Sequence, residues 1–369
     1  MVLSSTIQTT LSRYQQEIHG ALRSAIDARI ASHTDDDAPF YGQMQYHLGW
    51  VDANLSPATS NPGKLLRPTL VLLAYEAAGA WGLAGNSIPA SDYLQRALPA
   101  AAAVELTHNF TLIHDDIEDG DTERRHRPTL WSVWGIPQAI NTGDGLFALA
   151  RLTLWGVLER GVDGNIAAHL GRILDHACLV LAEGQYLDIS FEKRQDISVA
   201  MYVDMISRKT GALLGCAAEM GARIGTRDEQ TIEGLHHFGE AMGVAFQIRD
   251  DLLGVWASSA ESGKTEAGDI YRRKKSLPVL HALEHTSSQD RAFLNDMYRQ
   301  DTAVTEEQVK HVLAVMERTE TRACCSQFLI QQCQIAFEAL SSIPRVGKVS
   351  ERAIEDMETL VHFVEVAAH

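Results

Sequence analysis

The segment DYLQRALPAAAAVELTHNFTLIHDDIED, residues 92–119, decides the fold that we expect for this chain. It is rich in Ala and Leu and ends in a dense cluster of carboxylates. A strand would show a sustained period of two bounded by turn signals, and this run shows none. We therefore expect a helix over residues 92–117, with an acidic end that can contribute side chains to a site.

Helical spacing continues on both sides of this segment. In residues 3–31 the apolar residues recur at steps of three and four as one stripe, so we expect one helix there, ended by the breaker SHTDDDAP (32–39). The loop LSPATSNPG (55–63) precedes a helical stretch over 64–79. Further long helices are expected at residues 136–161, 165–190, 196–225 and 228–253, and again from about residue 275, after a loop over 257–273.

The sequence shows no strand pattern and no repeat of fixed period. We predict an all-α fold in which residues 1–369 form a single large helical bundle, with a motif-bearing core at about 63–280. In such a bundle the active site lies in a central cavity and is built from side chains on facing helices. The N-terminal stripe could instead form a separate hairpin or a dimer contact.

The composition excludes several classes of function. The 369 residues are 45% hydrophobic and 22% charged, as in a soluble globular protein, and 32 Lys and Arg against 48 Asp and Glu give a net charge of −16. A chain this acidic is not expected to bind nucleic acid. We expect no transmembrane segment and no signal peptide, because no apolar stretch has the required length or flanks. Five Cys without a CxxC pair are typical of a reduced cytoplasmic protein.

The sharpest chemical signal is HDDIEDGDTERRHRPT (114–129), in which Asp115, Asp116 and Asp119 form a DDxxD pattern. Residues four apart share a helix face, so the carboxylates of Asp115 and Asp119 would repel each other unless a cation lies between them. Hard oxygen ligands suit Mg²⁺. An isolated DDxxD is more often a solvated helix end. Here a second pair, Asp250 and Asp251, follows in the apolar context GVAFQIRDDLLGVW (243–256).

Basic residues follow both acidic clusters. They are Arg124, Arg125 and Arg127 after the first cluster, and Lys264, Arg272, Arg273, Lys274 and Lys275 after the second. The segment GKLLRP (63–68) adds Lys64 and Arg67 at an expected helix start, where backbone N–H groups already favour anions. Carboxylates that can hold a metal, together with basic side chains that can neutralise phosphate oxygens, indicate a phosphate substrate. Each basic group alone could be an ordinary solvated surface.

Together these motifs resemble the trans-isoprenyl diphosphate synthases, the polyprenyl synthetase family that contains the farnesyl and geranylgeranyl diphosphate synthases. The matching segments are, in order, GKLLRP (63–68), ELTHNFTLIHDDIEDGDTERRHRPT (105–129), EGQYLDI (183–189), Lys209–Thr210, GVAFQIRDDLLG (243–254) and GKTEAGDIYRRKKSLP (263–278). The resemblance implies a bundle of the isoprenoid-synthase type, a homodimer, and a prenyltransferase. Such an enzyme joins isopentenyl diphosphate to an allylic diphosphate by ionisation, condensation and elimination.

The resemblance also implies a role for each matching position. Asp115 and Asp119 would bind two Mg²⁺ ions and Asp250 a third, with Asp116 and Asp251 as supporting carboxylates. Contacts with the allylic diphosphate are implied for Arg124, Lys209, Thr210, Gln247, Lys264 and Lys274. The pocket for isopentenyl diphosphate would contain Gly63, Lys64, Arg67, His108 and Arg125. The implied catalytic set is Asp115, Asp116, Asp119, Arg124, Lys209, Asp250 and Lys264.

Two positions depart from the family pattern. The second acidic motif has Gly254 where many members have a third Asp. Arg273 stands where the family often has a Gly before its Lys, which leaves open whether Lys274 or Lys275 fills that place.

Two alternative functions fit the residues less well. A class I terpene cyclase would not need the second basic pocket that GKLLRP, His108 and Arg125 imply. A non-catalytic partner subunit should have lost aspartates or bases from its motifs, and this chain retains them.

Product length is expected to depend on the residues that precede the first aspartate. The resemblance points to Phe110, five residues before Asp115, and helical spacing puts Thr111 and Thr107 beneath that aspartate. A ring at Phe110 beside a small Thr111, without an insertion in DDxxD, resembles twenty-carbon synthases more than fifteen-carbon ones. We therefore predict geranylgeranyl diphosphate as the main product, with farnesyl diphosphate as the alternative.

Overall fold

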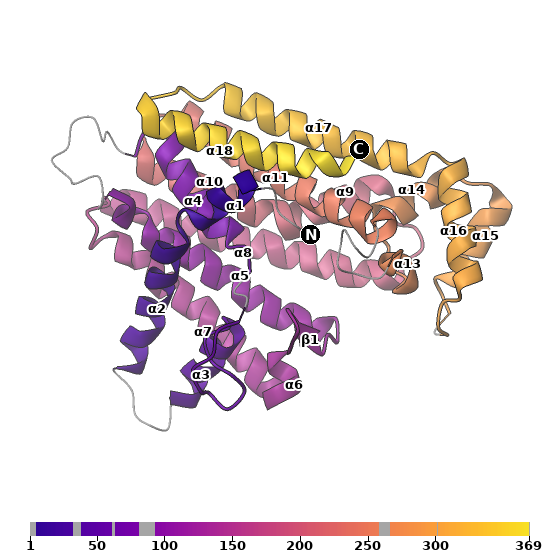
Figure 1. Cartoon of the computed structure of the whole chain (residues 1–369), viewed down its shortest axis with the longest axis horizontal. Coiled ribbons are helices and arrows are strands. Elements are labelled where there is room, and N and C mark those ends of the chain that lie inside the picture. Colours follow the sequence, from indigo (N-terminus) through magenta and orange to yellow (C-terminus); the bar gives the residue numbers. More distant parts are fainter. Residues whose placement is uncertain are drawn as a thin grey trace.

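A computed structural model describes residues 5–31, 38–60, 63–80, 93–257, 266–300 and 302–368, and most of these residues are helical (Figure 1). The predicted all-α fold is confirmed. Among the described residues, the only paired strands are the two-residue β1 (Glu123–Arg124) and β2 (Arg127–Pro128), a small hairpin that the sequence did not predict. None of the described helices is both long enough and apolar enough to cross a bilayer.

The helices fall into three groups along the chain. The N-terminal group is α1 (Ser5–Ser12), α2 (Gln15–Ile30), α3 (Ala38–His47), α4 (Leu66–Ala77) and η1 (Tyr93–Arg96). The central group is α5 (Leu98–Glu118), α6 (Leu130–Trp134), α7 (Ile136–Leu154), η2 (Trp155–Val157), α8 (Gly164–Lys193), α9 (Val199–Ile206), η3 (Ser207–Gly211), α10 (Ala212–Gly225) and α11 (Glu229–Trp256). The C-terminal group is α13 (Gly268–Tyr271), α14 (Leu277–His285), α15 (Ser288–Met297), α16 (Glu306–Arg318), α17 (Thr321–Ser341), α18 (Gly347–Glu365) and η4 (Val366–Ala368).

Helix α10 packs closely against α4 on one side and α11 on the other, and glycines make this possible. A Cβ on Gly221 of α10 would lie 2.0 Å from the carbonyl oxygen of Val71 in α4. On the other side, a Cβ on Gly239 of α11 would lie 2.4 Å from the carbonyl oxygen of Leu214. Any larger side chain at these positions would push the helices apart. The buried residues around them form one large apolar cluster that extends from α1 to α18.

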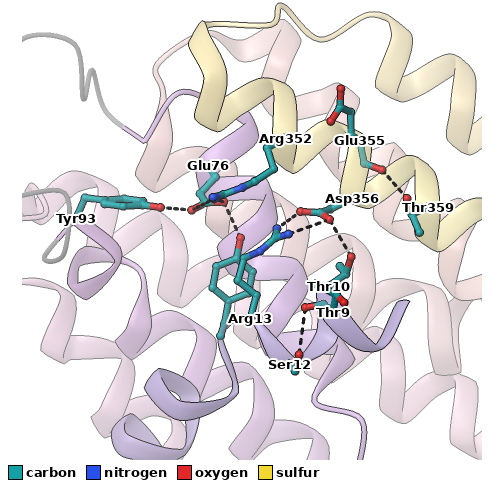
Figure 2. Close-up of polar contacts among 11 residues, drawn as sticks. Thr9, Thr10, Ser12, Arg13, Glu76, Tyr93, Arg352, Glu355, Asp356 and Thr359 are labelled. Atoms are coloured by element: carbon teal, nitrogen blue, oxygen red, sulfur yellow. Dashed lines mark hydrogen bonds and ion pairs between the residues drawn. The ribbon is translucent and has the colours of Figure 1, made fainter. Parts of the chain in front are cut away.

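The prediction of one helix over residues 3–31 is wrong, because the chain turns between α1 and α2. At the turn Arg13 forms an ion pair with Asp356 of α18 (Figure 2). The Tyr14 hydroxyl donates a 2.6 Å hydrogen bond to Glu76 of α4. The predicted apolar stripe is nevertheless buried on both sides of the turn, as shown by Ile7, Ile18, Leu22 and Ile26. Leu3, the first apolar residue of the predicted stripe, lies outside the described residues.

Glu76 joins the two ends of the chain. Its buried carboxylate accepts hydrogen bonds from Tyr93 and from Arg352 of α18, the latter at 2.8 and 2.9 Å (Figure 2). It also accepts the hydrogen bond from Tyr14. A buried carboxylate is costly unless charged and hydrogen-bonding partners surround it, as they do here. Segments outside the motif-bearing core therefore hold α4, the helix that begins in the GKLLRP segment.

Other predicted boundaries also need correction. Helix α3 lies in a stretch for which no helix was expected, and the predicted loop 257–273 contains the short helix α13. The predicted helix 136–161 ends at Leu154 and continues only as the 3₁₀ turn η2. The predicted helix 196–225 is interrupted by a π-helical turn, η3, which carries Lys209 and Thr210. Such turns often occur at functional sites, because they change the direction of side chains within a helix.

Candidate active site

The DDxxD aspartates lie at the C-terminal end of α5, and they do not share one environment. Asp116 is 1% exposed and receives a 2.6 Å hydrogen bond from Nε of Arg124. Asp115 is half-buried, and Asp119, the residue that caps α5, is exposed. The neighbours Asp115 and Asp116 therefore differ in accessibility, and the available carboxylates are those of Asp115 and Asp119.

The electrostatics of these carboxylates fit a cation. Burial, together with the nearby Asp119 and Glu118, raises the pKa of Asp115 to about 7 against the opposing effect of Lys209. Partial desolvation also raises the pKa of Asp119, and burial brings the pKa of Asp116 to about 6 despite Arg124. Desolvated carboxylates whose like charges repel are stabilised by a positive ion, and oxygen donors of this kind suit Mg²⁺.

The second acidic pair also consists of one buried and one accessible aspartate. Asp251 of α11 is fully buried and accepts hydrogen bonds from Tyr202 at 2.5 Å, Gln247 at 3.2 Å and Lys274 at 2.9 Å. The side chain of Asp250 is 63% exposed. Asp251 thus anchors α11 to its neighbours, whereas Asp250 is available to a ligand.

The π-helical turn η3 brings Lys209 among these carboxylates. Its Nζ lies 2.5 Å from Oδ2 of Asp188 in α8. Although burial opposes protonation, the carboxylates of Asp188, Asp115 and Asp119 raise the pKa of Lys209. The approach of η3 to α8 requires Gly184, because a Cβ there would lie 2.4 Å from the backbone nitrogen of Lys209.

The two lysines that the sequence could not distinguish have different partners. Nζ of Lys274 contacts Asp251 and lies 3.7 Å from Asp269. Nζ of Lys275 donates to the carbonyl oxygens of Phe191 and Glu192, at the end of α8. Lys274 is therefore the one beside the second acidic pair.

A basic pocket forms from segments far apart in the sequence. Nη1 of Arg67 in α4 lies 3.1 Å from Nε2 of His108 in α5. Burial, followed by the charges of Arg67, Arg125 and Arg124, lowers the pKa of His108 well below its usual range. The ring is therefore neutral and accepts a hydrogen bond from the guanidinium.

The β1–β2 hairpin supplies Arg125 to the same pocket. Gly63 has a φ of +92°, and a Cβ there would lie 2.6 Å from Nη2 of Arg125, so the contact requires glycine. Lys64 is exposed at the edge of this region. Lys264 lies outside the described residues.

Several residues of this region had no predicted role. Asp188 and Gln185 belong to the matching segment EGQYLDI, and Gln185 donates a 2.7 Å hydrogen bond to Glu118. Glu105 is 3% exposed and accepts a 2.9 Å hydrogen bond from Asn109. His47, beside Arg124 and Arg125, precedes the matching segments, so no motif could have identified it.

Phe110 and Thr111 lie on α5 below the aspartates. The ring of Phe110 is edge-on to Phe147 of α7, with centroids 5.1 Å apart. Arg151 covers Phe147, with its guanidinium carbon 3.3 Å from the ring centroid. Thr111 is buried and its hydroxyl donates to the carbonyl oxygen of His108 at 2.8 Å.

Known proteins resemble this chain over most of its length. The family model described as polyprenyl synthetase matches residues 49–316. A geranylgeranyl diphosphate synthase of Mycobacterium tuberculosis is 38% identical over 307 residues, which are 83% of each chain. A (2E,6E)-farnesyl diphosphate synthase of the same species is 35% identical over 324 residues, 87% of this chain and 84% of the relative.

Solved structures of the same family also resemble this chain in fold. The crystal structure of a polyprenyl synthetase from Streptomyces coelicolor A3(2) superposes with a TM-score of 0.83 at 36% identity, covering 97% of this chain and 99% of that one. A geranylgeranyl pyrophosphate synthetase from Pyrococcus horikoshii gives a TM-score of 0.81 at 29% identity, covering 97% and 98%. The chain therefore belongs to the polyprenyl synthetase family, and its activity is that of a short-chain prenyl diphosphate synthase, a prenyltransferase.

Proposed function

We propose that this enzyme condenses isopentenyl diphosphate with an allylic diphosphate and that geranylgeranyl diphosphate is its main product. The observation that carries the two-substrate reaction is the pairing of Arg67 with His108 in a basic pocket beside the DDxxD end of α5. This arrangement supports two diphosphate sites, one with the carboxylates and Lys209 and one with Arg67 and Arg125. A terpene cyclase would need only the first.

The residues available for the allylic diphosphate are those near the two acidic pairs. Divalent cations, which we propose to be three Mg²⁺ held by Asp115, Asp119 and Asp250, would supply the charge that stabilises the departing diphosphate. Asp116 and Asp251 support these positions through Arg124 and Lys274. Lys209, Thr210, Gln247, Lys264 and Lys274 are the proposed contacts to the diphosphate.

The chain's own charges favour ionisation of the allylic C–O bond, because fixed cations lie where negative charge develops. The proposed contacts of Gly63, Lys64, Arg67, His108 and Arg125 hold isopentenyl diphosphate by its diphosphate end, so that its double bond is free to attack the allylic cation. Holding both reactants in this way replaces a bimolecular encounter by an oriented one. We propose that the released diphosphate accepts the final proton, and that no side-chain nucleophile takes part.

The experiment that tests this function is product analysis of the purified enzyme with isopentenyl diphosphate plus dimethylallyl, geranyl or farnesyl diphosphate. Geranylgeranyl diphosphate as the end product is expected with each of the three. A reaction that stops at farnesyl diphosphate would support the alternative, which the name of one relative also supports. Hydrocarbon from farnesyl diphosphate alone would indicate a cyclase, and no turnover would indicate a non-catalytic subunit.

We further propose a cytoplasmic homodimer formed by residues 1–369 as one domain. Apolar side chains of α7, η2 and α8 support the dimer because they are exposed in the single chain, among them Ile140, Trp155, Leu179 and Tyr186. Light scattering coupled to gel filtration tests this assembly, and a monomeric mass at micromolar concentration would contradict it.

A further inference from the structure

We propose a transition-metal site on α11, formed by His236, His237 and Glu240 and oriented by Glu219 of α10. Its ligand class is a divalent cation that accepts imidazole nitrogen, with Zn²⁺ as the representative. This site is separate from the carboxylates that bind the diphosphate substrates, and it does not depend on the function proposed above.

The spacing of the ligand atoms carries the proposal. One oxygen of Glu240 lies 3.4 Å from Nε2 of His236 and 3.6 Å from Nδ1 of His237. One ligand atom from each of the three residues lies within 4.8 Å of the other two. Zinc bonds of about 2.0–2.1 Å at tetrahedral angles hold neighbouring ligand atoms about 3.3 Å apart. Small movements of these side chains are therefore enough to close the three ligands around one ion.

Glu219 provides an independent observation. Its Oε2 lies 3.2 Å from Nδ1 of His236, the ring nitrogen that faces away from Glu240. Histidines that bind a metal through one nitrogen almost always direct the other toward a carboxylate or a carbonyl, which fixes the tautomer and the ring orientation. Glu219 is itself held by Arg223 at 2.8 Å and is 16% exposed, so its position is well defined.

The backbone leaves room for this cluster. Gly215 of α10 faces it, and a Cβ there would lie 2.6 Å from Cγ of Glu240 and 3.3 Å from Cε1 of His236. A groove of about 490 Å³ between α8, α10 and α11 reaches Glu219, His236 and Glu240 and gives an ion and its remaining water ligand access from solvent. The side chain of His237 is 65% exposed at the edge of the cluster.

The chemistry separates this site from the substrate site. His236 precedes Asp250 by fourteen residues on the same helix, a rise of about 21 Å. Imidazole ligands favour Zn²⁺, Cu²⁺ or Ni²⁺, whereas Mg²⁺ prefers oxygen ligands and keeps several waters. Excess Mg²⁺ therefore competes for the aspartates and leaves the histidines free.

Without a metal, the same groups form an ion-pair cluster. Hydrogen bonds to Glu219 and then Glu240 raise the pKa of His236 to about 10. The experiment must therefore distinguish a metal site from a cluster that binds only protons.

The test uses the purified full chain, freed of metal by EDTA and dialysis, and kept in excess Mg²⁺. Zn²⁺ is titrated by calorimetry, and Co²⁺ is titrated as a spectroscopic probe of coordination. The variants are His236→Ala, Glu219→Gln and His237→Gln, the last at a side chain too exposed for the change to endanger folding. His176→Ala is the matched control, since His176 lines the same groove and is outside the cluster.

We expect one equivalent of Zn²⁺ to bind, and Co²⁺ to give the intense visible band of tetrahedral coordination with nitrogen ligands. His236→Ala and His237→Gln should each weaken binding at least tenfold, and Glu219→Gln by roughly tenfold, as is typical of a residue that orients a ligand. His176→Ala should bind as the wild type does. Equal binding by wild type, His236→Ala and His237→Gln would overturn the proposal, and so would the absence of saturable Co²⁺ absorption in the wild type.

Discussion

Nη1 of Arg67 lies 3.1 Å from Nε2 of His108, which joins two segments that are forty-one residues apart in the sequence. The contact links the start of α4 to the middle of α5, seven residues before Asp115. Because His108 is neutral, it orients the guanidinium without cancelling its charge. The charge of Arg67 thus remains available to a substrate anion.

This pairing leads to the first prediction, that the two diphosphate sites separate kinetically. Arg67→Ala should raise the KM for isopentenyl diphosphate roughly ten- to hundredfold, because a hydrogen bond to a charged group contributes about 1.5–3 kcal/mol. Lys209→Ala should mainly raise the KM for the allylic substrate. Steady-state kinetics with each substrate varied in turn checks both, and the same pattern of constants in the two variants would show that the pockets are wrongly assigned.

The second prediction distinguishes the members of each acidic pair. Asp115→Asn and Asp250→Asn should lower kcat by roughly two orders of magnitude or more, because each removes a carboxylate proposed to bind a metal ion. Asp250→Asn should leave the melting temperature nearly unchanged, because that side chain is 63% exposed. EDTA should have the same effect on the activity of the wild type. Activity that persists in EDTA would exclude the proposed metal ions.

Asp251→Asn is the contrasting variant. It removes the charge that pairs with Lys274 inside the fold, at 2.9 Å. Breaking a buried pair of this kind costs about 3 kcal/mol of unfolding free energy. Thermal unfolding should therefore show a clear loss of stability for Asp251→Asn and almost none for Asp250→Asn, and equal melting temperatures would contradict the division of roles.

The third prediction concerns pH. Burial raises the pKa of Glu105 from 4.5 to about 6. The folded state therefore binds this proton more tightly than the unfolded state, so the contribution of Glu105 to stability is greatest below pH 4.5 and is lost as the pH rises through 6. At pH 7 the loss is about 2 kcal/mol.

Glu105→Gln should abolish this loss. The variant should be more stable than the wild type at pH 7 and equally stable near pH 4.5, as measured by thermal unfolding at both values. Glu233→Gln, on the exposed side of α11, is the control and should show no such difference. If Glu105→Gln is instead less stable than the wild type at pH 7, the carboxylate is needed to balance Arg67.

The fourth prediction tests the link between the chain ends. Tyr14→Phe removes the 2.6 Å hydrogen bond to the buried carboxylate of Glu76 and should cost about 1.5–3 kcal/mol. Tyr271→Phe is the control, because that ring is exposed and lies outside this network. Unfolding in denaturant measures both, and equal effects would show that the network does not contribute to stability.

The sequence predicted most of the central helices, among them α5 and α11, which carry the two aspartate pairs. It could not predict the turn at Arg13 and Tyr14, because the partners that stabilise the turn, Asp356 and Glu76, are distant in the sequence. Local apolar spacing is the same on both sides of that turn, so periodicity alone gives one helix. Tertiary contacts decide such breaks.

The orientation of neighbouring site residues was also beyond the sequence. Lys274 and Lys275 are chemically identical, and only the contacts of Lys274 with Asp251 and of Lys275 with the end of α8 distinguish them. The π-helical turn at Lys209 depends on the close approach of Gly184, which no local pattern reveals. The catalytic and binding roles of these residues remain predictions.

The last prediction concerns product length. The rings of Phe110 and Phe147 pack edge-on with their centroids 5.1 Å apart, and Arg151 lies over the ring of Phe147. If these side chains form the floor of the space in which the product grows, Phe110→Ala removes the first barrier and leaves Phe147 as the second. The variant should therefore make products longer than the wild type does, and Phe110→Ala combined with Phe147→Ala should lengthen them again.

Chromatography of the dephosphorylated products from isopentenyl and farnesyl diphosphates measures the chain lengths. Phe110→Leu is the control, because it keeps an apolar side chain of intermediate volume and should shift the products less than Phe110→Ala. Ring removal from a packed position also lowers stability, so each variant is compared at a temperature where it remains folded. Since each condensation adds five carbons, a floor at Phe110 predicts that the length of the main product changes in steps of five carbons. A product distribution that is the same in wild type and Phe110→Ala would place the floor on another helix.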